Sequence, residues 1–226
     1  MIQTLSFRLP AVLSLVVLLG ACAQTAKQPD YTALRKSKPS SILVLPPVND
    51  TTDVAATYGM LSQMTRPLAE SGYYVIPVAV MDETFRQNGL TQAAEIEGVP
   101  AAKLREIFGA DAALYSKLTR YGSVYQIVDS TTVVAASARL VDLRTGDVLW
   151  QGEASATGTE AGGSRMSLDG MGIVGLLAQG VTRQVVHSLT DEAHDVAGLT
   201  SRRLLSAGQP NGLLYGPRST KYGTDD

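Results

Sequence analysis

Apolar residues change their spacing along the chain, and each spacing predicts a different element. Residues 42–45 form a short continuous apolar run that ends at a pair of prolines, a pattern typical of a buried strand. Apolar side chains then recur every fourth position over residues 56–70, which predicts a helix that ends at Ser71-Gly72. Because proline lacks a backbone N–H, we expect Pro67 to kink or shorten this helix.

The middle of the chain predicts further strands and helices, followed by a hairpin. Residues 132–141 alternate β-branched and small side chains, and residues 148–157 alternate again after a turn, which is typical of an antiparallel hairpin. The longest helix is expected to start near residue 173, and Gly198 to interrupt it. The other expected elements are a turn at 48–52, strands over 73–78 and 111–121, helices over 80–87 and 100–108, and a turn at 122–123.

This order of elements predicts the fold class. Strands that alternate with helices, followed by strands joined in a hairpin, are typical of a single α/β domain with a mixed sheet and packed helices. Of the 226 residues, 45% are hydrophobic and 18% are charged, which fits a folded chain with a sizeable core. The formal net charge of -2 provides no basic field, so we expect no nucleic-acid partner.

The first 22 residues follow a different pattern. One positively charged side chain, Arg8, precedes an apolar stretch over residues 11–19, and two small residues then lead to Cys22. A charged start, a short apolar stretch and small residues before a cleavage point are typical of a secretory signal peptide. The apolar stretch is shorter than the roughly 20 residues that a membrane-spanning helix needs. We therefore expect residues 1–21 to be removed as a signal peptide.

The tetrad Leu19-Gly20-Ala21-Cys22 resembles the lipobox of bacterial lipoproteins. The resemblance implies that Cys22 receives a diacylglycerol and that its new amino group is acylated after cleavage, and two or more acyl chains hold a protein firmly in a membrane. Ala23 follows in place of an aspartate, which by resemblance to enterobacterial lipoproteins implies export to the outer membrane, with the domain facing the periplasm or, as the alternative, exposed at the cell surface. Since Cys22 is the only cysteine, no disulfide is expected.

The rest of the chain divides into three parts. Residues 22–40 are polar and basic after the lipidated cysteine and are expected to form a flexible tether. Residues 41–208 contain the expected α/β domain. Residues 209–226 form a C-terminal tail with several glycine-containing turn signals, expected either to make a short surface hairpin or to run over the domain.

Several stretches resemble a family of uncharacterised bacterial lipoproteins, and the likeness covers almost all of the mature chain. The stretches are residues 41–50, 70–77, 110–115, 143–150 and 212–218. A more distant resemblance is to the periplasmic α/β domain shared by the TolB amino-terminal domain, the curli-secretion lipoprotein CsgG and the penicillin-binding-protein activator LpoB. It rests partly on a strand-pair tip of the form D-x-x-T-G-x-x-x-W, here Asp142, Thr145, Gly146 and Trp150.

The resemblance implies a TolB amino-terminal-domain-like fold and an envelope lipoprotein that serves with CsgG-like partners in export or envelope assembly. The sequence shows no obvious long amphipathic strands that could form pore hairpins, so a CsgG-like channel is not expected. A homo-oligomer is consistent with the sequence, which does not indicate the number of copies.

Few residues suggest chemistry. His187, Asp191 and His194 are spaced to share one helix face, and two imidazoles with a carboxylate are weak candidates for a divalent-metal site. That face is opposite an apolar stripe, so an ordinary solvated surface is favoured. Residues 170–175 match G-x-G-x-x-G, but no strand precedes them directly, so we expect no nucleotide cofactor. Because both histidines lie on one helix, a Ser-His-Asp triad is disfavoured.

Three hypotheses follow from the sequence. The first is a non-enzymatic lipid-anchored domain that binds envelope proteins, with tethering to the membrane as its mechanism. The second is an LpoB-like activator that binds a cell-wall synthase and alters its catalysis. The third, from another class, is a metal-dependent enzyme that uses the His187 face. We favour the first.

Overall fold

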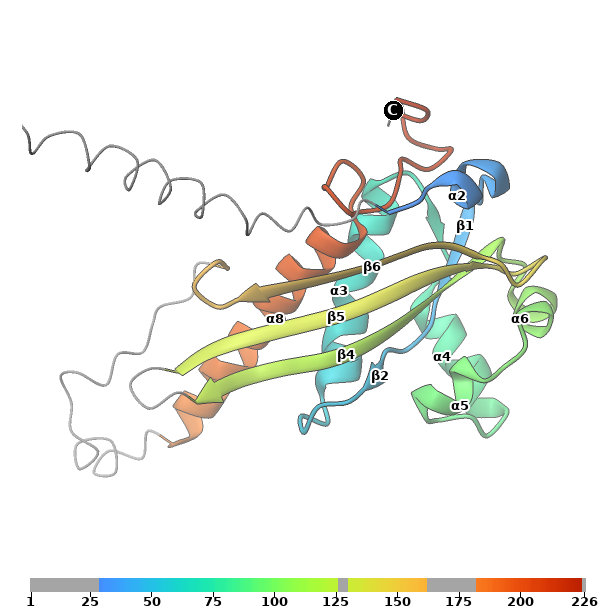
Figure 1. Ribbon diagram of the computed structural model, residues 1–226. Helices are drawn as coiled ribbons and strands as arrows, with labels where there is room; N and C mark the ends of the chain where they lie inside the picture. The colour runs from blue at the N-terminus through green and yellow to red at the C-terminus, as the bar shows by residue number, and fades with distance from the viewer. Residues whose placement is uncertain (1–28, 126–129, 162–181, 225–226) are drawn as a thin grey trace, which may run out of the picture.

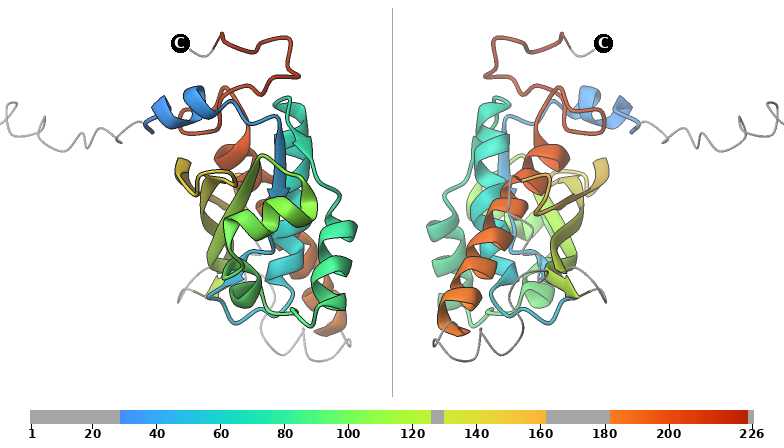
Figure 2. Two further views of the ribbon diagram at one scale, coloured as in Figure 1. Left: turned by 90° about the vertical axis from the view of Figure 1, so that its right-hand side faces the viewer. Right: turned by 90° about the vertical axis from the view of Figure 1, so that its left-hand side faces the viewer.

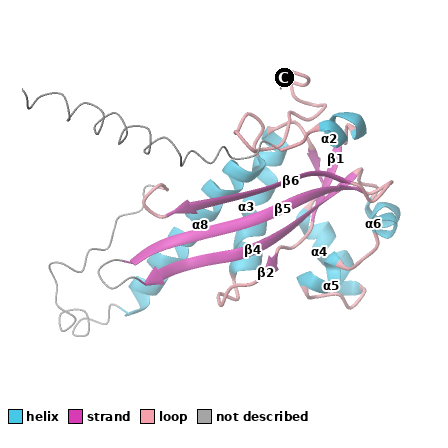
Figure 3. Cartoon of the chain, in the orientation of Figure 1, coloured by secondary structure: helices cyan, strands magenta, loops and turns pink. Residues whose placement is uncertain are grey.

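The computed structural model describes residues 29–125, 130–161 and 182–224. Strands and helices form two layers, with helices α3 and α8 side by side behind a long sheet (Figure 1). The views turned by 90° show the same arrangement edge-on (Figure 2), and Figure 3 separates the elements by type. The helices are α2 (Thr32–Ser37), α3 (Ala56–Glu70), α4 (Val78–Gln87), α5 (Ala93–Glu97), α6 (Ala101–Phe108) and α8 (Thr182–Leu205).

The sheet contains both parallel and antiparallel strand pairs. Its main order is β3-β1-β4-β5-β6, and the short strand β2 pairs beside β4. Strands β3 and β2 run parallel to their neighbours β1 and β4, and β1 also runs parallel to β4, whereas β4, β5 and β6 pair antiparallel. The strands are β1 (Ser41–Val44), β2 (Val48–Asn49), β3 (Tyr74–Val75), β4 (Ala112–Tyr125), β5 (Ser130–Asp142) and β6 (Val148–Thr157). The expected single α/β domain with a mixed sheet is confirmed.

The core lies between this sheet and its two long helices. The four apolar residues that predicted α3, Ala56, Met60, Met64 and Leu68, are fully buried. Strand β1 is buried along its apolar run, as its composition predicts. On α8, the Thr200 hydroxyl donates a hydrogen bond to the Val134 carbonyl at 3.2 Å, which fastens this helix to β5. Burial of matched apolar faces therefore determines how the layers stack.

Proline 67 does not shorten helix α3, so that part of the expectation is wrong. The helix continues to Glu70. Its last turn stays closed because the backbone N–H and the hydroxyl of Ser71 both donate to the Pro67 carbonyl, at 3.1 and 2.7 Å. These bonds satisfy a carbonyl that would otherwise be left open at the helix end.

Glycine 198 does not interrupt α8, contrary to expectation, because it has a packing role. The helix runs through it to Leu205. A Cβ at this position would lie 3.0 Å from Oε1 of Gln63 on α3. The residue therefore lets the two helices approach closely, which favours glycine even inside a helix.

The expected turn at residues 122–123 is also wrong. Strand β4 continues through Gly122 to Tyr125 and pairs with β5 from Ser130 onward. Gly122 has a φ of +104°, which a residue without Cβ tolerates inside a strand. Strand β3 is shorter than expected because Pro77 ends it and precedes α4. The turn expected at 48–52 begins with strand β2, and the sequence also did not predict helix α5.

The expected flexible tether is wrong from Tyr31 onward. Residues Thr32–Ser37 form helix α2, whose Leu34 is only 3% exposed. The Tyr31 hydroxyl donates to the Gly212 carbonyl at 2.7 Å, so this segment also touches the C-terminal tail. The described part of the tail runs over the domain and forms no strand. No helix among the described residues is both long and apolar enough to cross a bilayer.

Replacing Leu43 with alanine tests the placement of the core. The side chain is fully buried in β1, so Leu43→Ala should destabilise the fold by about 2–5 kcal/mol. Urea unfolding monitored by circular dichroism measures this change. Val80→Ala is the control, because Val80 is 55% exposed and its loss should change stability by less than about 0.5 kcal/mol. Equal effects of the two substitutions would show that β1 is misplaced.

Candidate functional site

An open groove of about 1060 Å³ lies over the face of β4, β5 and β6 that α3 and α8 leave uncovered. The alternation of side chains along β4 produces this face. The Ser116 hydroxyl points toward Met64 of α3, so the neighbouring Tyr115 and Lys117 point to the opposite side. The cross-strand partners of these two residues are Arg139 and Ser137. The next strand, β6, supplies Gln151 and Glu153.

An arginine stacked on a tyrosine occupies the floor of the groove. The guanidinium carbon of Arg139 lies 4.7 Å from the centre of the Tyr115 ring, a cation–π contact. The tyrosine is buried, which raises the pKa of its hydroxyl. Arg139 remains exposed, and within the described residues it makes no ion pair of 4 Å or less. The groove therefore holds an oriented cation at its floor.

Two carboxylates give the groove mixed charge. Glu97 of α5 accepts the Ser116 N–H at 3.3 Å, and burial raises the pKa of this carboxyl although that hydrogen bond and Arg139 act in the opposite direction. Glu153 of β6 is exposed at the far wall. Lys117 is paired with Asp50 at 2.6 Å. A surface of this kind suits hydrogen bonds and ion pairs to a polypeptide better than burial of a small apolar ligand.

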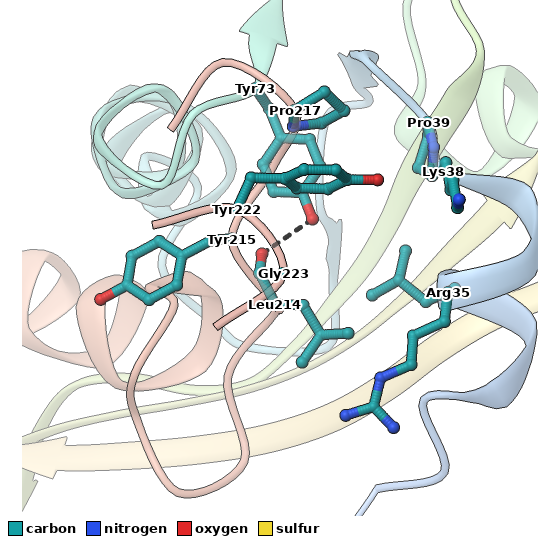
Figure 4. A pocket seen from close by; sticks show the side chains of 10 residues that line it. Arg35, Lys38, Pro39, Tyr73, Leu214, Tyr215, Pro217, Tyr222 and Gly223 are labelled. Atoms are coloured by element: carbon teal, nitrogen blue, oxygen red, sulfur yellow. Dashed lines mark hydrogen bonds between the residues drawn. The ribbon is translucent and has the colours of Figure 1, made fainter. Parts of the chain in front are cut away.

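A second, smaller pocket of about 240 Å³ lies between α2 and the C-terminal tail. Figure 4 shows Arg35 and Lys38 on the α2 side and three tyrosines, two from the tail and one that directly precedes β3. The hydroxyl of Tyr73 donates to the Leu214 carbonyl at 2.8 Å, and this bond fastens the tail across the pocket (Figure 4). The tyrosines are Tyr73, Tyr215 and Tyr222.

A buried carboxylate, Asp142, positions α2 beside the sheet. The Ser37 hydroxyl of α2 donates to its Oδ2 at 2.5 Å, and the Arg144 backbone N–H and guanidinium donate to its oxygens at 2.8–3.3 Å. Burial by itself would raise the pKa of Asp142, but the hydrogen bonds from Arg144 and Ser37 outweigh it and hold the pKa at about 2. Asp142 is the first residue of the D-x-x-T-G tip, so the motif has a structural use here.

Most of the site residues predicted from the sequence lie outside the described residues. Cys22 precedes the first described range, and residues 170–175 fall between two of them. The backbone of His187 and Asp191 belongs to α8, but their side chains are not described. His194 is exposed, and its imidazole contacts the Gln63 side chain. Among the described side chains, no three histidines, cysteines, aspartates or glutamates gather as metal ligands would.

The aromatic residues pack in the core, and several of them also line a pocket. Trp150 and Tyr73 are 2% and 5% exposed. Trp150 and Tyr115 line the groove, and Tyr73 lines the smaller pocket. Sequence reasoning did not single out Arg139 or Glu97. The signal for Arg139 was an isolated charge in a strand of otherwise small and β-branched residues, but nothing in the sequence indicated that Glu97, 42 positions earlier, would lie near it.

Comparisons with known proteins identify the family of this chain. The family described as "Putative lipoprotein GNA1162-like" matches residues 29–218. The chain belongs to this family. It is 49% identical over 212 residues to "Putative lipoprotein NMB1124/NMB1162" of Neisseria meningitidis serogroup B, covering 92% of this chain and 96% of that protein. The resemblance stated from the sequence is therefore confirmed.

A solved structure of a family member agrees with this placement. The crystal structure of lipoprotein GNA1162 from Neisseria meningitidis shares 48% identity and a TM-score of 0.52, covering 66% of this chain and 99% of that one. A weaker match is the C-terminal domain of LpoB from Salmonella enterica, with 20% identity and a TM-score of 0.38, covering 52% of this chain and 82% of that one.

The low pKa of Asp142 predicts how stability depends on pH. A carboxyl whose pKa is lower in the folded chain than its ordinary 3.8 stabilises the fold above about pH 4, and this contribution is lost as the pH falls toward 2. The shift corresponds to roughly 2 kcal/mol. Asp142→Asn should lower stability at pH 7 by about this amount and flatten the acid limb of the stability profile.

Urea unfolding at a series of pH values measures this profile. Asp147→Asn is the matched control, because Asp147 is an exposed carboxylate in the same turn. The control should keep the acid limb of the parent protein. A parent-like acid limb in Asp142→Asn would mean that the Ser37 and Arg144 contacts do not stabilise the charged form.

Proposed function

We propose that this protein is a lipid-anchored envelope lipoprotein whose domain binds another envelope protein through the groove over β4, β5 and β6, without catalysing a reaction itself. The observation that carries the proposal is the groove: an uncovered sheet face with the oriented cation of Arg139 and the acidic side chains Glu97 and Glu153. Mixed polar surfaces with an arginine and aromatic residues are common at protein interfaces. Membership of a lipoprotein family supports the anchor.

The length of the tether supports a membrane-confined mode of action. Because the chain is packed on the domain from Tyr31, the link between Cys22 and the domain is much shorter than the sequence suggested. From Cys22 to Pro29 there are seven peptide steps, which span at most about 25 Å when fully extended. A partner in the same membrane would therefore meet the groove at a high effective concentration.

The lipid anchor is tested at Cys22. Cys22→Ala removes the acyl acceptor, so the variant should incorporate no labelled palmitate and should keep its signal peptide. The matched control is Ala23→Asp, which retains the thiol. It should incorporate palmitate like the parent but, by the enterobacterial sorting rule, fractionate with the inner membrane in place of the outer. Palmitate on the Cys22→Ala chain would contradict the anchor.

The groove is tested by reversing the charge at its floor. A photo-crosslinking residue at Gln151 should yield a discrete adduct with an envelope protein in intact cells, and Arg139→Glu should reduce the adduct about tenfold or more. Arg120→Glu, an exposed arginine of β4 outside the groove lining, is the control and should leave the adduct unchanged. An adduct that persists in Arg139→Glu would place the docking surface elsewhere.

A further inference from the structure

Positive charge is concentrated in the two terminal segments of the mature chain. Residues 23–40 and 206–226 together carry six lysines and arginines against three aspartates, whereas residues 41–205 carry twelve against eighteen acidic residues. The overall charge of -2 conceals this separation. Because charges of one sign gathered on one face create a local potential, the two groups of residues should differ in what they attract.

The fold brings the two basic segments together. Helix α2 and the C-terminal tail lie side by side at the top of the molecule in Figure 1 and line the pocket of Figure 4. We call this surface the basic end. Its exposed cations are Arg35, Lys36, Lys38, Arg218 and Lys221. Of the three aspartates in the two segments, Asp30 accepts the Thr32 N–H at 2.9 Å, and residues 225 and 226 lie outside the described chain.

Tyrosines are interleaved with these cations. Arg218 lies over the ring of Tyr74 at 5.0 Å, and Lys221 lies over the ring of Tyr215 at 5.4 Å. Tyr74 and Tyr222 are 43% and 44% exposed. Five of the nine tyrosines in the sequence belong to this end or border it: Tyr31, Tyr73, Tyr74, Tyr215 and Tyr222. Tyrosine and basic side chains together are typical of surfaces at the lipid headgroup level, where one end of the ring is apolar and the other is wet.

The attachment of Tyr31 to the tail places the basic end close to the lipid anchor. Pro29 lies two residues before Tyr31, which is bonded to the tail. At most about 25 Å of chain separates Pro29 from Cys22, so the acyl chains enter the membrane close to the basic end. A tether of this length keeps the basic end within reach of the headgroups.

We propose that the basic end docks on anionic lipid headgroups of the membrane that holds the acyl chains. The proposal rests on the lipid anchor of the proposed function and adds an orientation to it. Lysines and arginines near an anionic bilayer are attracted to its surface potential, and exposed tyrosines insert their rings at the headgroup level. Docking fixes which way the domain faces, whereas the acyl chains alone would leave it free to turn.

Amine labelling of the lipidated protein on vesicles tests the orientation. On vesicles of phosphatidylcholine mixed with phosphatidylglycerol, Lys36, Lys38 and Lys221 should react several-fold more slowly than on pure phosphatidylcholine. Lys103 and Lys117, which lie outside the basic end, serve as internal controls and should react equally on both. High salt should remove the difference, because exposed charges are screened within about 10 Å at 0.1 M ionic strength. Equal labelling on the two membranes would overturn the proposal.

A second measurement separates docking from anchoring. The unlipidated mature chain, from residue 22 with Cys22→Ser, should sediment with the phosphatidylglycerol vesicles but not with pure phosphatidylcholine. Lys36→Glu combined with Lys221→Glu should reduce that binding about tenfold or more. Arg66→Glu combined with Lys103→Glu, an equal charge change on α3 and α6, should not.

The outcomes of the two sets of experiments are distinct. Loss of palmitate labelling in the parent protein would remove the anchor. Intact palmitate labelling with no preference for anionic vesicles, or with equal effects of both charge reversals, would remove only the docking proposal. Melting temperatures of all variants within a few degrees of the parent would show that the surfaces compared are folded.

Discussion

The buried carboxylate of Asp142 is the contact on which the arrangement of the chain ends depends. It accepts hydrogen bonds from the Ser37 hydroxyl and from the Arg144 N–H groups, and these bonds join the end of α2 to the turn between β5 and β6. Asp111 repeats this arrangement at the neighbouring strand, where its Oδ2 accepts the backbone N–H and hydroxyl groups of Ser40 and Ser41 at 2.8–3.2 Å. Two short acidic side chains thereby hold residues 37–41 at the sheet. Without them, α2 would keep its buried Leu34, the Tyr31–Gly212 hydrogen bond and the bond from Arg144 to the Ser37 carbonyl.

The sequence predicted those parts of the fold that bury long regular apolar patterns. Strand β1 follows a continuous apolar run, helix α3 a period of four residues and the β5–β6 hairpin a period of two, and each lies where its pattern indicates. Helix α2 escaped prediction because its six residues bury a single apolar side chain, so polarity alone suggested a tether. In the sequence, Gly122 and Gly198 suggested breaks in a strand and a helix. The structure shows a different role for each: Gly122 has a positive φ inside β4, and Gly198 lies at the close contact between α8 and α3. Neither feature can be recognised from the sequence.

The candidate site was less predictable than the fold for a similar reason. A catalytic motif is readable when its residues lie at fixed spacing in the sequence, but the groove is assembled from the α2 segment, α5, three strands and Asn211 of the tail. Arg139 gains its orientation from Tyr115, which lies on another strand, 24 positions earlier. The lipobox-like tetrad shows the opposite case, because it acts as a linear signal and needs no folded partner to be recognised in sequence.

The contacts of Tyr31 and Ser37 also determine how the domain would respond to a mechanical pull on its N-terminal segment. A pull transmitted from a lipid at Cys22 would reach Tyr31 and Ser37 before it reached β1. The Tyr31 side chain would transmit the pull to Gly212 of the tail, and the Ser37 side chain would transmit it to Asp142. Asp142 lies at the turn between β5 and β6, at the opposite edge of the sheet from β3. Such a pull would be divided between these two contacts before it reached β1. Helix α2 and its contacts would therefore yield before the core did when the membrane anchor moved relative to the domain.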